Sequence, residues 1–209
     1  MLRHGRTDWN LQRRFQGQTD IALDDVGLEQ AERAAAMLAS LRPTRIVSSD
    51  LQRAQQTAAA VARRTGLPVH IDAGLRETFA GDWEGLTQSE LAERFGDAVA
   101  AWGSRSDIRP GGHGETRIEV AERVVRCVER ELAEVPAHGS LLVVTHGGAA
   151  RAGIGLLLGL PVEHWAVLGV LSNCSWTVLV EDGAAHRPRW RLQEYNAGTL
   201  PEPALGDDR

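Results

Sequence analysis

Amphipathic helical stretches alternate with short apolar stretches along most of this 209-residue chain, and this alternation narrows the folds open to it. The expected helices cover residues 26–41, 51–65, 87–102, 115–134 and about 149–158. The expected strands include 45–48 and 141–145, and a hairpin is expected near the C-terminus. Such alternation predicts an α/β fold in which helices cover a central sheet.

The apolar periodicity also predicts which side chains face the core. The helix over 26–41 should bury Leu28, Ala31, Ala35 and Leu38. The helix over 115–134 should bury Ile118, Ala121, Val125, Val128 and Leu132. Gly96 is an expected helix break, Gly147-Gly148 an expected turn, and Asp182-Gly183 the expected turn region of the hairpin, whose first strand begins near Cys174.

The start of the chain is unusual for an α/β protein. Polar motifs of this class follow an opening strand, yet Arg3 comes only two residues after the start. Either the true start lies upstream of Met1, or the first strand is unusually short. One domain is expected over residues 1–196, followed by a loose tail over 197–209 that is rich in proline, glycine and aspartate.

Composition excludes several classes of function. All 23 cationic residues are arginine, so no lysine is present for Schiff-base, pyridoxal-phosphate or Walker-type phosphate chemistry. The net charge of −5 is spread along the chain and gives no basic surface for nucleic acid. No apolar run suits a membrane span or a signal peptide, which predicts a cytoplasmic protein with reduced, interior thiols at Cys127 and Cys174.

Four segments place polar side chains directly after an apolar strand, or on a neighbouring loop or helix start. They cover residues 2–5, 48–54, 75–77 and 144–148. The carboxyl ends of strands gather at one edge of an open α/β sheet, where ligands bind. We therefore expect five side chains from these segments to lie close together: Arg3, His4, Arg53, Glu77 and His146.

Such a group of side chains suits phosphoryl transfer. Two arginines bind a phosphoryl group bidentately, whereas most of the other arginines are interpreted as solvated helix faces. A neutral imidazole is a competent nucleophile, and a second one donates to the phosphoryl oxygens. A protonated carboxyl group gives its proton to the leaving oxygen. No cluster of metal ligands is present in the sequence, and none of this chemistry requires a metal or another cofactor.

The same segments resemble the histidine phosphatase superfamily, also called the phosphoglycerate mutase-like family. The motifs are Asn10, Arg-His-Gly-Arg-Thr at 3–7, Phe-Gln-Gly at 15–17, Ser-Ser-Asp-Leu-Gln-Arg-Ala at 48–54, Leu-Arg-Glu at 75–77, Gly-Asp-Trp-Glu-Gly at 81–85, Gly-Glu-Thr at 114–116 and His-Gly-Gly at 146–148. The resemblance extends from Met1 to about Asn196. It implies a three-layer α/β/α sandwich with a mixed, mostly parallel central sheet.

The resemblance also assigns roles to individual residues. It implies that His4 is phosphorylated in the intermediate and that Glu77 is the proton donor. Arg3, Arg53 and His146 would complete the phosphate site. Residues expected to bind substrate beside them are Asn10, Gln16, Gly17 and Gly147.

Family resemblance leaves phosphatase and mutase open. Mutases of this family carry Arg-His-Tyr after the catalytic glutamate, then a longer insertion, and tend to have threonine where Gln16 stands. Here Glu77 is followed by Thr78-Phe79-Ala80, with no such insertion before His146. A more open site admits water, so we favour a phosphatase. A non-catalytic module that binds phosphorylated ligands is the third alternative, but it usually lacks the nucleophile or the acid.

The expected partner is a small phosphorylated metabolite. Residues 75–87, 171–177 and 189–196 resemble most the actinobacterial glucosyl-3-phosphoglycerate phosphatases. The last two stretches are expected to form the hairpin and therefore indicate kinship more than specificity. A broad phosphatase of sugar phosphates or phosphoglycerates and an alpha-ribazole phosphatase-like enzyme stay open, and a homodimer is compatible with the sequence.

Overall fold

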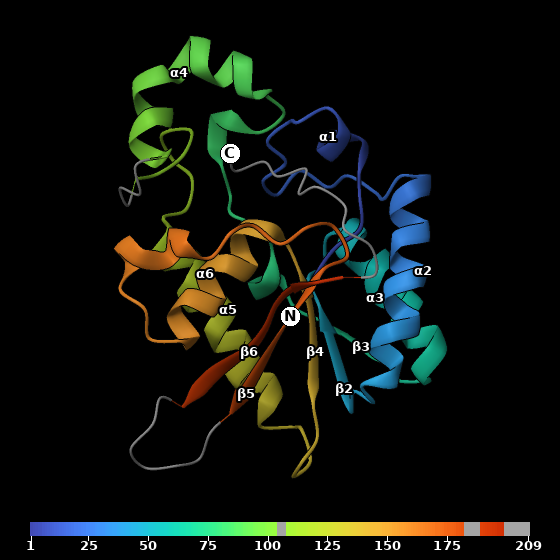
Figure 1. Cartoon of the computed structure of the whole chain (residues 1–209). Coiled ribbons are helices and arrows are strands. Elements are labelled where there is room, and N and C mark those ends of the chain that lie inside the picture. The colour runs from blue at the N-terminus through green and yellow to red at the C-terminus, as the bar shows by residue number, and fades with distance from the viewer. Residues whose placement is uncertain (104–107, 182–188, 199–209) are drawn as a thin grey trace.

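A six-stranded sheet forms the centre of the computed structural model, which describes residues 1–103, 108–181 and 189–198 (Figure 1). The strands are β1 (Leu2–Arg3), β2 (Arg45–Ser48), β3 (Val69–Ile71), β4 (Leu141–Thr145), β5 (Trp176–Glu181) and β6 (Trp190–Ala197). Their order in the sheet is β3-β2-β4-β1-β5-β6. Strands β1 to β4 pair in parallel, whereas β5 runs antiparallel to β1 and to β6. This confirms the predicted mixed, mostly parallel sheet.

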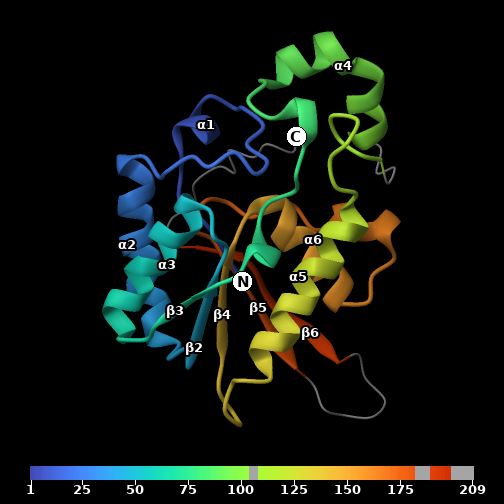
Figure 2. The same cartoon turned by 180° about the vertical axis from the view of Figure 1, so that it is seen from behind.

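Helices cover both faces of the sheet. In both views, α2 (Asp25–Ser40) and α3 (Gln52–Thr65) lie on one face, and α5 (Arg117–Leu132) and α6 (Gly147–Leu157) on the other (Figures 1 and 2). The short α1 (Asp8–Leu11) and the longer α4 (Gln88–Gly103) lie beyond the end of the sheet where β4 leads into α6. In the described part of the chain, three short 3-10 helices cover Ala73–Leu75, Gly81–Trp83 and Val162–Val167.

The alternation of side chains along the strands creates the two cores. Ile46, Leu142 and Val144 belong to the buried cluster with α2 and α3. Their neighbours Val47 and Val143 belong to the cluster with α5 and α6. Successive side chains of a strand point to opposite faces, so each central strand stabilises both layers. This arrangement is the predicted three-layer α/β/α sandwich.

Strand β1 contains only two residues, yet it lies in the middle of the sheet. Leu2 is fully buried and pairs with Val144 on one side and Trp176 on the other. These two residues are enough to place the following motif at the carboxyl end of a central strand. Strand β3 was not predicted, because its three residues at the sheet edge are largely exposed and form no apolar run.

The buried faces of two helices differ from the predicted ones. Leu28 of α2 is 44% exposed and Ile118 of α5 is 39% exposed. The buried stripe of α2 comprises Gly27, Gln30, Ala31, Ala34, Ala35 and Leu38. That of α5 comprises Val120, Ala121, Val124, Cys127, Val128 and Glu131. Both helices carry apolar residues over a wide arc, so helical spacing alone does not fix which part of the arc meets the sheet.

Local details correct three further predictions. Gly147 and Gly148 are not a turn but the first residues of α6, with His146 as the N-cap. The break in α4 lies at Phe95, one residue before the predicted glycine. Cys174 lies before β5 in a left-handed conformation, with φ of 53°. The predicted hairpin turn at 182–183 and the tail beyond residue 198 lie outside the described residues.

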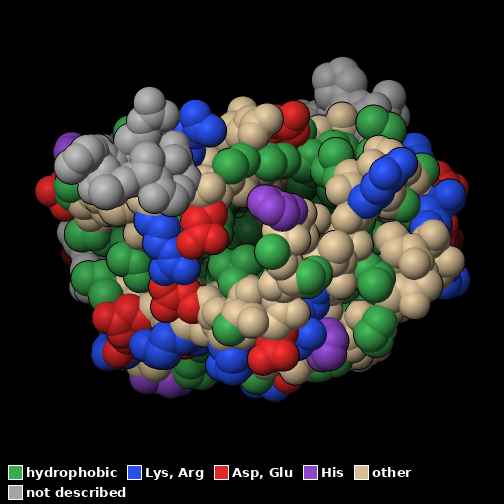
Figure 3. Space-filling view, turned by 90° about the horizontal axis from the view of Figure 1, so that it is seen from below, with side chains coloured by type: hydrophobic (Ala, Val, Ile, Leu, Met, Phe, Trp, Pro, Cys, Tyr) green, Lys and Arg blue, Asp and Glu red, His purple; other side chains and the backbone are tan. Residues whose placement is uncertain are grey.

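On the face of the molecule shown in Figure 3, positive and negative side chains are not separated into patches. Acidic side chains and arginines lie beside one another over that face (Figure 3). Among the helices that the structure describes, none combines the length and the apolar character needed to cross a membrane. Cys127 and Cys174 are both buried and belong to the clusters on opposite faces of the sheet.

Candidate active site

The structure brings the five predicted side chains to one end of the sheet. Arg3 ends β1 and His4 follows it, while His146 follows the neighbouring strand β4. Arg53 lies in the first turn of α3, directly after β2, and Glu77 lies in the loop after the 3-10 helix at 73–75. All except Glu77 are at most 2% exposed. Parallel pairing of β1, β2 and β4 is what aligns these chain segments.

The ring of His4 has one nitrogen tied to the backbone. Its Nδ1 lies 2.7 Å from the carbonyl oxygen of Gly5. A carbonyl only accepts hydrogen bonds, so Nδ1 carries the ring proton and Nε2 keeps a lone pair. Gly5 is in turn held by Thr57 Oγ1 and approaches Gly27 so closely that an added Cβ would lie 2.5 Å from the Gly27 oxygen. The His4 ring is therefore presented with a nucleophilic Nε2.

Burial and neighbouring cations keep two histidines neutral. Burial lowers the pKa of His4 well below 6.5, and the positive charges of Arg53 and Arg3 lower it further. Burial, and then Arg53, likewise lower the pKa of His146. The two rings lie 5.1 Å apart between centroids. Near pH 7 both imidazoles are therefore uncharged, as a nitrogen nucleophile must be.

Arg53 fixes the second histidine and the turn opposite it. Its Nε donates to His146 Nδ1 at 3.1 Å, while Nη2 and Nη1 donate to the carbonyl oxygens of Gly17 and Thr19, each at 2.8 Å. Because a guanidinium only donates, the neutral His146 ring carries its proton on Nε2, which lies 2.9 Å from Ser49 Oγ. Gly17 has φ of 51°, and an added Cβ there would collide with Glu84.

Three buried nitrogen atoms of the site lack a hydrogen-bond partner. They are Arg3 Nε, Asn10 Nδ2 and Gln16 Nε2. The Asn10 amide is oriented by Thr7 N and Asn173 Nδ2, which both donate to its Oδ1 and leave Nδ2 directed elsewhere. The single Thr7 hydroxyl lies within hydrogen-bond distance of Asn10 Oδ1 and of Gln16 Oε1. An unsatisfied buried donor costs about 1–3 kcal/mol. All three donors belong to residues that the sequence predicts for the phosphate site, and an anion would supply the acceptors that they lack.

The carboxylate of Glu77 lies at the N-terminus of α6. Its Oε2 accepts from Gly148 N, and its Oε1 accepts from Ala149 N, each at 2.9 Å; Thr78 N also donates to Oε1 at 2.8 Å. An added Cβ on Gly148 would lie 2.7 Å from Glu77 Oε1. One on Gly147 would lie 2.8 Å from Val170. Because both residues are glycines, the N-terminus of α6 can approach Glu77. The N–H groups at this end of the helix favour a negatively charged group beside them.

Some residues that shape the site were not assigned a role from the sequence. Ser49 contacts His146, and the Thr7 hydroxyl contacts the side-chain oxygens of Asn10 and Gln16. Asn173, in a stretch interpreted as structural, donates to the His4 carbonyl oxygen at 3.1 Å and to Asn10 Oδ1 at 3.2 Å. The first two belong to the motifs quoted above, which was an available signal. Within the described part of the chain, no three or more His, Cys, Asp or Glu side chains are grouped so as to hold a metal ion.

The buried neutral histidines predict a loss of stability in acid. The unfolded chain protonates His4 and His146 near their ordinary value of 6.5, whereas the folded chain keeps them neutral to lower pH. The unfolded state thus binds more protons as the pH falls below 6.5. Each histidine should lower the free energy of unfolding by about 1 kcal/mol per pH unit in that range. Chemical denaturation at a series of pH values, in buffers without phosphate, measures this slope.

The histidine contribution is isolated by comparing variants. His4→Asn should reduce the pH slope of stability, because one buried titrating ring is gone. His70→Asn should not, since His70 is exposed on β3. A His4→Asn protein with the wild-type slope would show that His4 is not held neutral in the folded state.

Comparison with known proteins assigns nearly the whole chain to one family. Residues 1–197 match the family described as histidine phosphatase superfamily (branch 1). A glucosyl-3-phosphoglycerate phosphatase of Mycolicibacterium vanbaalenii is 44% identical over 211 residues, which cover 94% of this chain and 93% of the relative. A mycobacterial glucosyl-3-phosphoglycerate phosphatase solved with VO3 is 42% identical and superposes with a TM-score of 0.89, covering 95% of this chain and 98% of the other.

A further structure links the fold to a phosphate ligand. The mycobacterial glucosyl-3-phosphoglycerate phosphatase solved with inorganic phosphate is 41% identical, with a TM-score of 0.86 and coverage of 95% of this chain and 96% of the other. The sequence and the fold of this chain are therefore similar to those of these phosphatases over nearly its full length. The chain belongs to branch 1 of the histidine phosphatase superfamily and is a phosphatase, a hydrolase with the phosphoglycerate mutase-like fold.

Proposed function

We propose that this chain hydrolyses the phosphomonoester of a small phosphorylated metabolite through a phosphohistidine at His4, without a metal ion. The observation that carries the proposal is the set of three unpartnered buried donors on Arg3, Asn10 and Gln16, next to a neutral His4 with a free lone pair on Nε2. A phosphoryl dianion supplies the acceptors that these donors lack. The proposed nucleophile, His4, directly follows Arg3 along the chain.

The residues support a two-step reaction. Nε2 of His4 attacks phosphorus, and the bond from phosphorus to the substrate oxygen breaks as Glu77 gives that oxygen a proton. Arg3 and Arg53 stabilise the phosphoryl oxygens, which carry the charge of the transition state, and His146 joins them when its Nε2–H donates to a phosphoryl oxygen in place of Ser49 Oγ. Glu77, now a carboxylate, then accepts a proton from water as the water oxygen attacks the phosphohistidine. Inorganic phosphate forms and His4 is regenerated.

The substrate class follows from kinship. Glucosyl-3-phosphoglycerate is the substrate named for the relatives that are 44% and 42% identical over nearly the full chain. Their likeness supports a phosphorylated sugar or phosphoglycerate here, with glucosyl-3-phosphoglycerate as the first compound to test. In this class the leaving group is an alkoxide, which is a poor leaving group without a proton. The acid role of Glu77 is therefore most important for such substrates.

The test is phosphate release by the purified wild-type protein, with a chelator present, from p-nitrophenyl phosphate and from a panel of sugar phosphates and phosphoglycerates. We expect hydrolysis that the chelator does not reduce, and the highest kcat/KM on glucosyl-3-phosphoglycerate or a related compound. No release from any member of the panel would overturn the catalytic proposal. Loss of activity with the chelator would overturn the metal-independent mechanism.

The mutase alternative is separated by a second assay. The protein is given 3-phosphoglycerate together with 2,3-bisphosphoglycerate, and both 2-phosphoglycerate and free phosphate are measured. A phosphatase releases phosphate, because water reaches the phosphohistidine before a second acceptor does. Efficient formation of 2-phosphoglycerate with little free phosphate would instead establish a mutase.

A further inference from the structure

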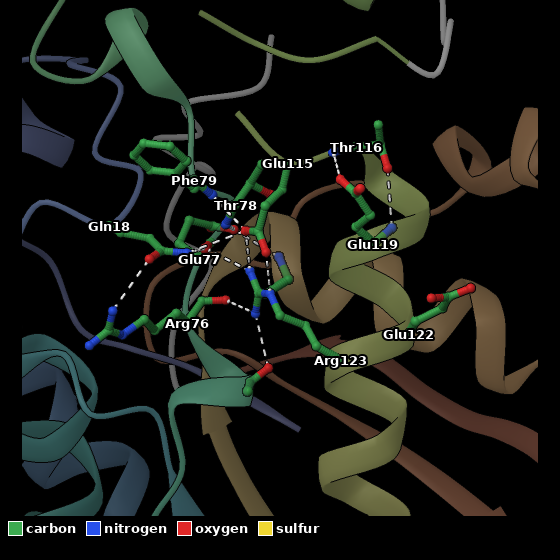
Figure 4. A network of polar contacts seen from close by, with 12 residues as sticks. Gln18, Arg76, Glu77, Thr78, Phe79, Glu115, Thr116, Glu119, Glu122 and Arg123 are labelled. Carbon is green, nitrogen blue, oxygen red and sulfur yellow. Dashed lines mark hydrogen bonds and ion pairs between the residues drawn. The ribbon is translucent and has the colours of Figure 1, made fainter. Parts of the chain in front are cut away.

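Arg123 of α5 lies outside the predicted site, yet it directs its whole guanidinium at the chain around Glu77 (Figure 4). Its Nη1 donates to the carbonyl oxygens of Gly74 at 2.9 Å and Arg76 at 2.6 Å, and its Nη2 donates to that of Glu77 at 2.9 Å. The side chain is 15% exposed. Arg123 therefore holds three carbonyl groups of the loop that precedes and includes Glu77.

The partner of Arg123 holds the other side of the same loop. Glu115 accepts from Arg123 Nε and Nη2, each at 2.8 Å, which is a bidentate pair. Its Oε2 also accepts from Phe79 N at 2.9 Å and from Gln18 Nε2 at 3.3 Å. Gln18 Nε2 lies 3.1 Å from the Glu77 carbonyl oxygen as well. The ion pair thus ties down the backbone before and after Glu77.

The contacts between Glu115 and Arg123 favour the charged form of both side chains. Glu115 is partly buried, and this burial by itself raises its pKa. The hydrogen bonds and charge of Arg123 outweigh it, so the pKa of Glu115 is lowered overall. A bidentate, charge-assisted pair keeps both side chains in one orientation better than a single hydrogen bond does. The loop is therefore anchored on a rigid helix rather than on another loop.

We propose that Arg123 is a positioning residue for Glu77: it fixes the loop so that the carboxyl group stays between the N-terminus of α6 and the leaving oxygen of the substrate. The inference rests on the proposed role of Glu77 as proton donor. Arg123 itself contacts backbone and Glu115, and takes no part in the bonds that form or break. Misplacing a reacting group by about 1 Å costs roughly 100-fold in rate, so the anchor matters for catalysis.

The leaving group of the substrate distinguishes positioning from general damage. Nitrophenolate departs without a proton, whereas an alkoxide must be protonated. Arg123→Gln and Arg123→Lys should therefore lower the rate of leaving-group release in the first turnover by about 100-fold on the alkyl phosphate that the wild type hydrolyses fastest. The single-turnover release of nitrophenolate should fall by about threefold or less, because nitrophenolate leaves without the proton that Glu77 gives. The second step, in which Glu77 accepts a proton from water, is the same for both substrates and does not enter a measurement of the first turnover. KM should change little on either substrate.

A matched control lies one turn along the same helix. Arg126 is 66% exposed and forms a surface ion pair with Glu122 at 3.6 Å, so Arg126→Gln should match the wild type on both substrates. Arg123→Lys keeps the positive charge but not the fork of donors. A lower rate in Arg123→Lys would therefore come from lost positioning, because the positive charge that acts on the nearby His146 is kept.

Three results would overturn the inference. They are an equal loss in first-turnover leaving-group release on both substrates, a wild-type rate of that release on the alkyl phosphate for Arg123→Gln, and full rescue by Arg123→Lys. If Arg123→Gln does not fold, Glu115→Gln provides the test, because one amide oxygen cannot accept all the bonds that the carboxylate accepts. Failure of the proposed function would appear differently, as a wild-type protein without phosphatase activity.

Discussion

Phosphate release should vanish in His4→Ala, falling by at least about four orders of magnitude, because no other side chain of the site offers a free nucleophilic nitrogen. His146 is the only other imidazole within the described group of site residues, and its Nδ1 is occupied by Arg53 while its Nε2 faces Ser49. Loss of the nucleophile removes the covalent intermediate rather than weakening it. The measurement is kcat on p-nitrophenyl phosphate, whose release of nitrophenolate makes small residual rates visible.

The variant must keep its fold for this result to count. His4 is buried, so His4→Ala leaves a cavity; His4→Asn is the companion variant, since its amide can still donate to the Gly5 carbonyl oxygen. His70→Ala, at an exposed position on β3, is the matched control and should keep wild-type kcat. Continued hydrolysis by a folded His4 variant would rule out the phosphohistidine mechanism.

The intermediate itself offers a second readout. A phosphorylated histidine is labile in acid and stable in base, unlike a phosphorylated serine. Rapid quenching of wild-type protein in base during turnover should therefore trap a phosphorylated species that mass spectrometry maps to the peptide with His4. The same treatment of His4→Asn should trap none.

The grouping of His4, Arg53 and His146 could be predicted from the sequence because of where these residues lie along the chain. His4 and His146 follow the parallel strands β1 and β4, and Arg53 opens the helix after β2. A polar side chain directly after a buried parallel strand lies at the carboxyl end of the sheet. Its position in the sequence therefore predicts its position in the fold. The long helices were equally clear, since each repeats its apolar side chains over several turns.

Arg123 was inaccessible for the opposite reason. It stands in the middle of an amphipathic helix, where an arginine normally marks a solvated face, and most arginines were interpreted in that way. Its partners are carbonyl groups of a loop and Glu115, none of which leaves a pattern at helical spacing. The rotation of α5 that brings it inward is set by packing against the sheet, which periodicity does not determine. Contacts to backbone far along the chain require the structure.

Replacing Arg53 with lysine is expected to lower kcat/KM by about two to three orders of magnitude, although the positive charge is kept. The guanidinium serves three acceptors in different directions: His146 Nδ1 and the carbonyl oxygens of Gly17 and Thr19. A single ammonium group cannot reach all three, so buried acceptors lose their donor and the His146 ring loses its orientation. The steady-state parameters on p-nitrophenyl phosphate, with inhibition by inorganic phosphate, measure the effect. Arg3→Lys should behave similarly, since Arg3 brings a fixed Nε–H to the site.

The same helix supplies the control for Arg53. Arg63 is 63% exposed and pairs with Glu32 at the surface, where lysine serves as well as arginine. Arg63→Lys should therefore retain kcat/KM within about twofold, as should Arg130→Lys on α5. Thermal unfolding of all four variants separates lost activity from lost fold. If lysine were tolerated equally at residues 3, 53, 63 and 130, charge alone would suffice at the site, and the planar fork of donors would have no part in holding the phosphoryl group.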